Sequence, residues 1–218
     1  MNVNSGESGN TAPGSTHPPP ALPGHEHIKR YWDPTRRCFA AKILPGEFYV
    51  TTRSELITTV LGSCISACIR DSALGVGGMN HFMLPHSNDA ADWGGASLAA
   101  RYGSHAMEAL INDIIKAGGN RNRLEVKAFG GANVVAAATS IGSKNAEFLH
   151  QFIEIEALKL VSADLGGHHP RKVVFFPHNG RVQIKKLRVQ HNDTILRREE
   201  SYSYRLEKQP VSGDIELF

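Results

Sequence analysis

The 218-residue sequence predicts an α+β fold, a layered sandwich of mixed β-sheet with packed helices. Three observations lead to this prediction. Short apolar runs bounded by turn residues are typical of strands, two longer segments carry apolar residues at helical spacing, and a hairpin signal lies near residue 180. Strands interleaved with helices in this order favour helices layered against a sheet.

Two of the apolar runs, 65–70 and 75–84, bring the first candidate site together. The first is apolar or small in character and contains β-branched Ile65 and Ile69, the second is a similar apolar run, and the turn-forming segment 71–74 separates them. If the two strands pair as a simple antiparallel hairpin around this turn, Cys64 lies directly opposite His81, with Cβ atoms roughly 4.5–5.5 Å apart. A slip of one residue would place the two side chains on opposite faces.

A cysteine beside a histidine is a nucleophile with its base, because an imidazolium lowers the pKa of the thiol and later protonates the leaving group. Gly62 and Ser63 precede Cys64, and a tight turn there would point backbone N–H groups outward as donors to an oxyanion. The alternative is that Cys64 is a small buried hydrophobic residue and His81 a hydrogen-bonded core histidine.

The remaining elements follow in chain order. The first strand is predicted at 47–51, a helix runs from an N-cap at Ser97 to about 117, and a strand at 125–129 leads into Gly130-Gly131. A second helix begins at Ser143, and strands 172–176 and 181–185 flank the Asn179-Gly180 turn. The apolar stripes comprise Leu98, Tyr102, Ala106, Leu110 and Ile114 in the first helix and Phe148, Phe152 and Ile155 in the second.

Composition divides the chain into four parts. Residues 1–24 are rich in Gly, Ser and Pro and are predicted to be a disordered tail, followed by an N-terminal extension at 25–46. The folded domain spans 47–190, and 191–218 is a charged C-terminal extension, interpreted as solvated rather than docked. His25 and His27 are interpreted as solvated residues and not as metal ligands.

The net charge of +3, without a basic stripe, argues against nucleic-acid binding, and no apolar run is long enough to span a membrane. The three cysteines and the lack of an export signal predict reduced thiols in the cytoplasm. Cys68 shares a strand face with Cys64 and is interpreted as a buried small residue, although it could be a second reactive thiol. Cys38 lies outside the motif.

The segment from Thr58 to Pro85, with its LGSC and GGMNHFMLP blocks, resembles the CheD family of chemoreceptor glutamine deamidases. The resemblance continues through segments 101–103, 127–132, 141–145 and 164–167 and covers about residues 47–190. It implies a CheD-like fold, similar to that of the toxin-type cysteine deamidases.

The resemblance also implies a function, the conversion of selected glutamine side chains of methyl-accepting chemotaxis receptors to glutamate, without a cofactor or a metal. Cys64 would be the nucleophile and His81 the base and acid. Thr58 would hold the imidazole ring, although the pattern alone leaves Thr59 open for this role. The partners would be the cytoplasmic helical domains of chemoreceptors and a CheC-type phosphatase.

Two other functions remain open at this point. A non-catalytic adaptor would bind receptors or a CheC-type phosphatase without needing Cys64. A papain-like protease would use the same pair on main-chain amides. A polar loop after Pro85, with Trp93, is long enough to line the rim of the site in each case.

Overall fold

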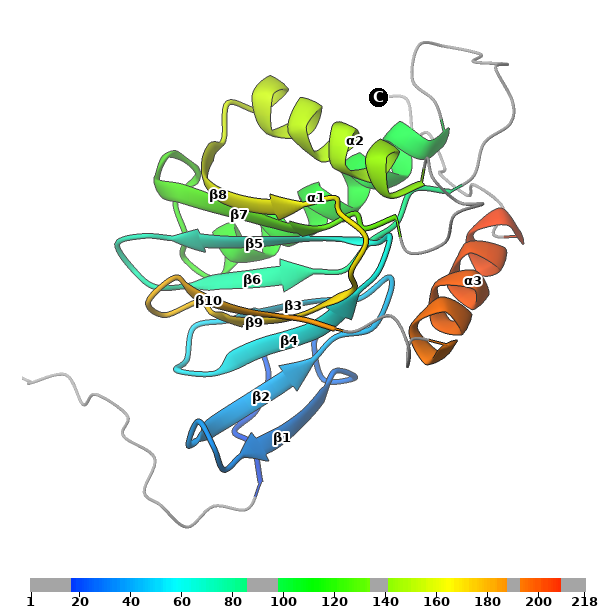
Figure 1. Ribbon diagram of the computed structural model, residues 1–218. Coiled ribbons are helices and arrows are strands. Elements are labelled where there is room, and N and C mark those ends of the chain that lie inside the picture. The colour runs from blue at the N-terminus through cyan, green and yellow to red at the C-terminus, as the bar shows by residue number, and fades with distance from the viewer. Residues whose placement is uncertain (1–16, 86–97, 134–140, 188–192, 209–218) are drawn as a thin grey trace, which may run out of the picture.

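A computed structural model shows two five-stranded sheets packed face to face, with two helices on the outer face of the second sheet (Figure 1). The described residues are 17–85, 98–133, 141–187 and 193–208. The predicted α+β class with mixed sheets and packed helices is confirmed. Residues 1–16, the loop with Trp93 and the N-cap candidate Ser97 lie outside the described residues. The prediction that the disordered tail reaches residue 24 is wrong, because Leu22 packs against the core and the carbonyl of Pro19 accepts from Arg30.

Both sheets are mixed, since β2–β4 and β7–β8 pair in parallel and the other neighbours pair antiparallel. The first sheet contains, in spatial order, β1 (Lys29–Asp33), β2 (Cys38–Lys42), β4 (Leu56–Leu61), β9 (Arg171–Phe176) and β10 (Arg181–Lys186). The second contains β3 (Phe48–Thr51), β6 (Gly77–Asn80), β5 (Ile65–Asp71), β7 (Leu124–Gly130) and β8 (Lys159–Leu165). The helical elements are α1 (Leu98–Lys116), the 3-10 turn η1 (Arg121–Arg123), α2 (Ile141–Ile155) and α3 (Asp193–Lys208).

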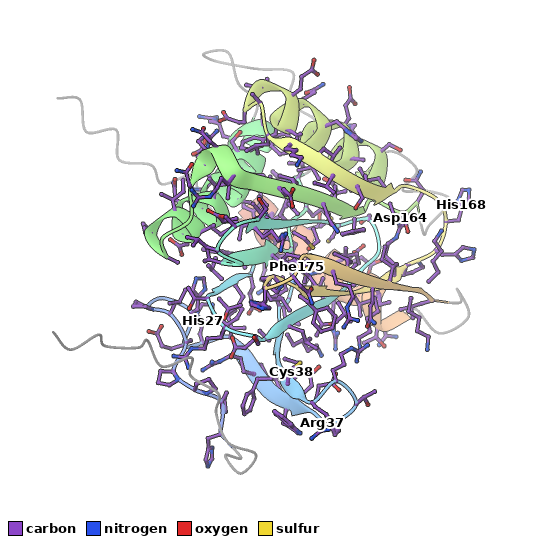
Figure 2. The ribbon with its side chains drawn as sticks, turned by 90° about the vertical axis from the view of Figure 1, so that its left-hand side faces the viewer. His27, Arg37, Cys38, Asp164, His168 and Phe175 are labelled. Atoms are coloured by element: carbon purple, nitrogen blue, oxygen red, sulfur yellow. The ribbon has the colours of Figure 1, made fainter. Side chains whose placement is uncertain are left out.

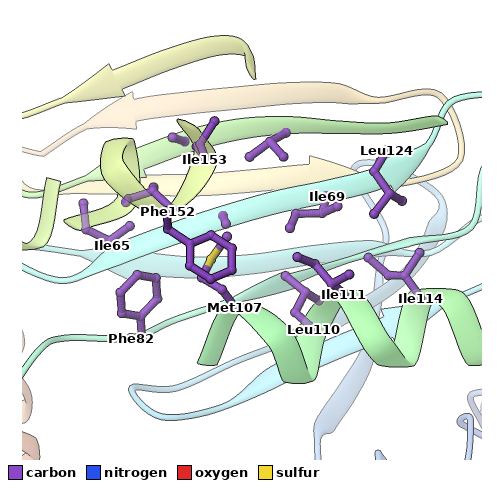
Figure 3. Packing of buried hydrophobic residues seen from close by; sticks show 14 of the residues in the cluster. Ile65, Ile69, Phe82, Met107, Leu110, Ile111, Ile114, Leu124, Phe152 and Ile153 are labelled. Carbon is purple, nitrogen blue, oxygen red and sulfur yellow. The ribbon is translucent and has the colours of Figure 1, made fainter. Parts of the chain in front are cut away.

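Two apolar clusters hold the layers together, and β5 contributes to both. Ile65 and Ile69 face α1 and α2, where they pack with residues such as Leu110 and Phe152 (Figure 3). Residues of the opposite parity, Cys64 and Cys68, face the first sheet and pack with Ile57 and Val173 of β4 and β9. The alternation of a strand therefore places Cys64 between the sheets.

The prediction that 25–46 is an extension outside the domain is wrong, because this segment forms the β1–β2 hairpin of the first sheet. Its buried residues are small, with Ala40 and Ala41 fully buried on opposite faces of β2, while β1 is polar, so the apolar alternation that marks a strand is weak here. The predicted first strand at 47–51 is therefore the third, and β4 and β8 were not predicted at all.

The helix and hairpin predictions hold with local changes. α1 matches its predicted range, and β9 and β10 pair from Phe176 and Arg181 as the Asn-Gly turn predicts. α2 buries Leu149, Phe152 and Ile153, whereas Ile155, predicted on the buried face, is 78% exposed at the end of the helix.

The predicted solvated states of His25 and of the C-terminal segment are also wrong. His25 is buried against Phe48 and Tyr49, with Asp113 beside it, while His27 is exposed as expected. Residues 193–208 form α3, which lies apart from α1 and α2 at one end of the sheets (Figure 1).

Cys38, by contrast, lies beside Arg37 on the β1–β2 hairpin (Figure 2), on a different sheet from the other cysteines. It is half-buried, and its thiol is free. His168 is exposed on the loop beyond Asp164, as predicted (Figure 2).

Candidate active site

The pairing of β5 with β6 differs from the predicted register by two residues. Ile65 lies opposite Phe82 and Ile69 opposite Gly78, so Cys64 and His81 are diagonal neighbours rather than direct partners. The reason is that the connection is longer than assumed, with β5 ending at Asp71 and β6 beginning at Gly77. A shift of two residues preserves the face of every side chain, which is why both still point between the sheets.

Cys64 and His81 come together in the interior. The Cys64 thiol, a ring nitrogen of His81 and a carboxylate oxygen of Glu199 all lie within 4.8 Å of one another. Cys64 is 0% and His81 2% exposed. The pair inferred from the sequence is thus assembled in the fold, with a third member that sequence reasoning did not supply.

Thr59, and not Thr58, contacts the imidazole. The Thr59 hydroxyl donates its proton to the carbonyl of Ile43 and lies 2.8 Å from Nδ1 of His81. Since the hydroxyl has only one hydrogen, it accepts from Nδ1–H, which leaves Nε2 as the lone-pair nitrogen. Nε2 is buried and makes no hydrogen bond within the described part of the chain, so it is available to a thiol proton.

The expectation that Thr58 holds the ring is therefore corrected. The Thr58 hydroxyl donates to the carbonyl of Val173 at 2.9 Å, and the Thr58 carbonyl accepts the N–H of Ile43. Neighbouring residues of a strand point to opposite faces, so only one of the two threonines on β4 can face His81. β4 is one of the strands that the sequence analysis did not predict.

The turn before β5 forms a cluster of converging N–H donors. The backbone N–H groups of Gly62, Ser63 and Cys64 all donate to the carboxylate of Glu199, at 2.8, 2.9 and 3.2 Å. The hydroxyl of Ser63 donates to the same group at 2.7 Å. The predicted outward-pointing donors are present, and an anion already occupies them.

Two neighbouring segments fix this turn. The Gly131 N–H donates to the carbonyl of Cys64 at 2.8 Å, and at Gly130, with φ 113°, a Cβ would lie 2.1 Å from that carbonyl oxygen. Asn145, fully buried on α2, donates to the carbonyl of Ser63 and accepts from the N–H of Leu84. These residues connect the turn that carries Cys64 to the chain just beyond His81.

The electrostatics of the pair are those of neutral groups. Burial raises the pKa of the Cys64 thiol well above its ordinary value, and the Glu199 carboxylate raises it further. Burial lowers the pKa of His81 from 6.5 to about 4. In this conformation the pair is a thiol and a neutral imidazole at pH 7, whereas the sequence analysis expected an imidazolium that lowers the pKa of the thiol.

Cysteine, histidine and glutamate are also metal ligands, but the carboxylate here is satisfied by other partners. One oxygen of Glu199 accepts from Gly62 and Cys64, and the other accepts from the N–H and hydroxyl of Ser63. These donors use the lone-pair positions that a cation would need. Cys68 is 1% exposed, and burial raises its pKa as well, in agreement with its interpretation as a buried small residue.

Sequence reasoning missed the contribution of α3. Among the α3 side chains that the structure describes, the buried ones are Glu199, Tyr202 and Leu206, spaced three and four residues apart on one helical stripe. Tyr202 packs against Gly46, and its hydroxyl is hydrogen-bonded to that of Tyr102. The stripe is visible in the sequence, but it is short and is surrounded by charged residues.

Comparison with known proteins gives relatives along almost the whole chain. Proteins named probable chemoreceptor glutamine deamidase CheD from Halorhodospira halophila and Hahella chejuensis are 56% identical over 203 residues and 50% identical over 210 residues. The alignments cover 92% and 96% of this chain, and 94% and 100% of the relatives. The chain belongs to the CheD family.

A further CheD relative, from Janthinobacterium sp. strain Marseille, is 54% identical over 190 residues, which is 86% of this chain and 93% of the relative. The family model for CheD chemotactic sensory transduction matches residues 83–186 and so begins two residues after His81. The aligned lengths exceed the segment 47–190, so the relatives share part of the terminal regions as well. Among the described residues, no helix is long and apolar enough to cross a membrane.

Proposed function

We propose that this chain is a cytoplasmic protein-glutamine deamidase that converts glutamine side chains of chemoreceptors to glutamate and releases ammonia. One observation carries the proposal: the Cys64 thiol and a ring nitrogen of His81 lie within 4.8 Å of each other, beside three converging backbone N–H donors. Relatives that are 48–56% identical are named for this activity.

Each residue has a defined task in the proposed reaction. Nε2 of His81 takes the thiol proton, and the Cys64 sulfur attacks the side-chain carbonyl carbon of the glutamine. The N–H groups of the Gly62–Cys64 turn stabilise the oxyanion. The carbon–nitrogen bond then breaks, His81 gives its proton to the departing ammonia, and a thioester remains on Cys64.

Hydrolysis completes the cycle. His81 takes a proton from a water molecule, the hydroxide attacks the thioester carbon, and the carbon–sulfur bond breaks. The thiolate regains its proton from His81, and the product carboxylic acid releases its proton to solvent to become a carboxylate. Thr59 acts as a positioning residue, because its hydroxyl fixes the tautomer in which Nε2 is unprotonated.

Replacement of Cys64 tests the proposal. Incubation of the protein with receptor cytoplasmic fragments should add about one dalton per modified glutamine, measured by intact mass and peptide mapping. Cys64→Ser should lower this rate by at least about a thousandfold, since a serine hydroxyl is a much weaker nucleophile beside a single histidine.

Cys68→Ala is the matched control, because it removes the neighbouring buried thiol and should retain most of the activity. Full activity of the Cys64→Ser protein would disprove the nucleophile assignment. If the parent modifies no glutamine, and if the parent and the Cys64→Ser protein bind the fragments equally well, the adaptor function is supported instead. Cleavage of the fragment backbone would indicate a protease.

A further inference from the structure

α3 closes the proposed active site. Glu199 is 7% exposed, and beneath it Cys64 and His81 are 0% and 2% exposed. A glutamine side chain therefore cannot contact the thiol while α3 remains in this position. Catalysis by the Cys64–His81 pair requires α3 to move.

The carboxylate of Glu199 occupies the position that a substrate head group would need. It accepts the N–H groups of Gly62, Ser63 and Cys64, the same donors that the mechanism assigns to the oxyanion. A Cβ on Gly62 would lie 2.8 Å from the carboxylate, so the close approach depends on glycine. A side-chain carboxylate is also the chemical group that deamidation of glutamine produces.

α3 is held by a narrow stripe of side chains. Tyr202 and Leu206, three and seven residues after Glu199, are buried at 5% and 8% exposed, whereas Glu200 and Arg205 are exposed. Tyr202 lies against Gly46, where a Cβ would approach its ring to 2.8 Å. The surface beneath α3 thus already accommodates a helix through residues at positions i, i+3 and i+7.

The other side of α3 borders a cleft of about 800 Å³ that is mainly basic. Arg197 and Arg205 of α3 line it together with Lys29 and Lys42 of the first sheet, and Glu47 is the one carboxylate among the described lining residues. Because the cations outnumber this carboxylate, the like charges around the cleft repel one another. A helix of 16 residues is also only marginally stable without its contacts. Both effects favour a helix that can be displaced.

We propose that α3 is an intramolecular inhibitor that occupies the docking surface of the substrate helix. This inference rests on the proposed function. A receptor helix displaces α3 and presents a glutamine at the position of Glu199, with bulky apolar side chains three and seven residues later at the positions of Tyr202 and Leu206.

Alkylation of Cys64 in the full-length chain tests whether α3 covers the site. Glu199→Ala removes the buried carboxylate, and Glu200→Ala removes the adjacent exposed carboxylate from the same helix. With iodoacetamide at pH 7, Cys64 should react at least about tenfold faster in Glu199→Ala than in the parent, the factor expected for one charge-assisted hydrogen bond. Glu200→Ala should match the parent, and Cys38, mapped in the same digests, gives the reference rate.

Deamidation of a receptor fragment should rise in the same variant. Equal alkylation of Cys64 in all three proteins would overturn the inference, and so would faster alkylation without faster deamidation in a protein that is active. If Cys64 becomes reactive but no variant modifies a glutamine, the covering role of α3 stands and the proposed function fails.

A second variant tests the position itself. In Glu199→Gln the chain carries a glutamine where the substrate glutamine is proposed to lie, so Cys64 should convert the introduced glutamine back to glutamate within the same molecule. Intact mass should increase by about one dalton over time, and the added substitution Cys64→Ser should abolish the increase. A Glu199→Gln protein that modifies receptor fragments but never itself would overturn the proposed substrate position.

Discussion

At one end of β5 lies the carboxylate of Asp71, and at the other end the turn before Ile65 binds the carboxylate of Glu199. Both groups are buried, and both accept three backbone N–H donors. Their remaining partners differ: Asp71 also binds the guanidinium of Arg123, whereas Glu199 binds the neutral hydroxyl of Ser63.

These different partners indicate that the Asp71 carboxylate is a permanent part of the fold, whereas the anion bound by the turn before Ile65 can be exchanged. The Arg123 guanidinium beside Asp71 holds the pKa of that carboxyl well below its ordinary value, and the bond ties the end of β5 to η1. The donors around Glu199 carry no formal charge and belong to a turn next to a nucleophile. Neutral, preorganised donors suit an anion that is present only during part of a reaction cycle.

Removing each carboxylate's charge should therefore have unequal effects on stability, and this is the largest expected difference. Asp71→Asn should lower the free energy of unfolding by about 2–4 kcal/mol, because buried donors lose their acceptor and the arginine loses its partner. Glu199→Gln should cost less than about 1 kcal/mol, since its effect is limited to the docking of α3. It is measured in the Cys64→Ser background, with Cys64→Ser alone as its reference, so that the introduced glutamine is not converted back to glutamate. Urea unfolding followed by circular dichroism measures both values.

The slope of the urea transition is the accompanying control, because loss of α3 docking alone leaves the cooperative unit almost unchanged. A Glu199→Gln protein as unstable as Asp71→Asn would mean that Glu199 is a structural anchor like Asp71. The comparison between the two ends of β5 would then fail, and the inhibitory role of α3 with it.

The two ends of β5 also differ in how far the sequence predicts them. Cys64 and His81 were placed on a common face by assuming a short turn, and the actual pairing is two residues away. The prediction that the two side chains share a face is nevertheless correct, because side chains alternate with a period of two and a register error of two residues conserves the face. An error of one would have separated the pair.

The contributions of Thr59 and Glu199 could not be predicted in the same way. The choice between Thr58 and Thr59 depends on β4 and on its neighbours in the first sheet, which are set by contacts distant in the chain. Glu199 reaches the Gly62 turn across 137 residues, from a helix with few apolar residues. Local patterns carry no information on such long-range contacts.

Acid should destabilise the two ends of β5 in separate pH windows, by on the order of 1–3 kcal/mol each. Burial lowers the pKa of His81 from 6.5 to about 4, so the unfolded chain binds a proton that the folded chain does not. The free energy of unfolding should fall as the pH drops through this range. The pKa of Asp71 lies below its ordinary 3.8, so its contribution is present at higher pH and is lost as the pH falls below about 3.8.

Urea unfolding from pH 7 to pH 2 measures the upper window and follows the lower one as it opens below about pH 3.8. Asp71→Asn should flatten only the lower window, and His81→Asn should reduce the slope only in the upper one. His25, whose pKa is also lowered by burial, contributes to the upper window and should leave a residual slope there. A loss of both windows in either variant would show that the two ends of β5 do not titrate independently.

The smallest expected effect comes from a single neutral hydroxyl at the Glu199 end of β5. Thr59→Val keeps the shape of the side chain but leaves Nδ1–H of His81 without its acceptor and the carbonyl of Ile43 without its donor, at a cost of about 1–2 kcal/mol in stability. Deamidation of a receptor fragment should fall about tenfold, with a changed pH dependence of kcat, because the tautomer with a free Nε2 is no longer fixed. Thr59→Ser restores the hydroxyl and should restore both.

Thr58→Val loses a comparable hydrogen bond to Val173 on the opposite face, so it should cost similar stability while the pH profile stays that of the parent. If Thr58→Val alters the pH profile and Thr59→Val does not, the positioning role belongs to Thr58, as the resemblance to the family first implied.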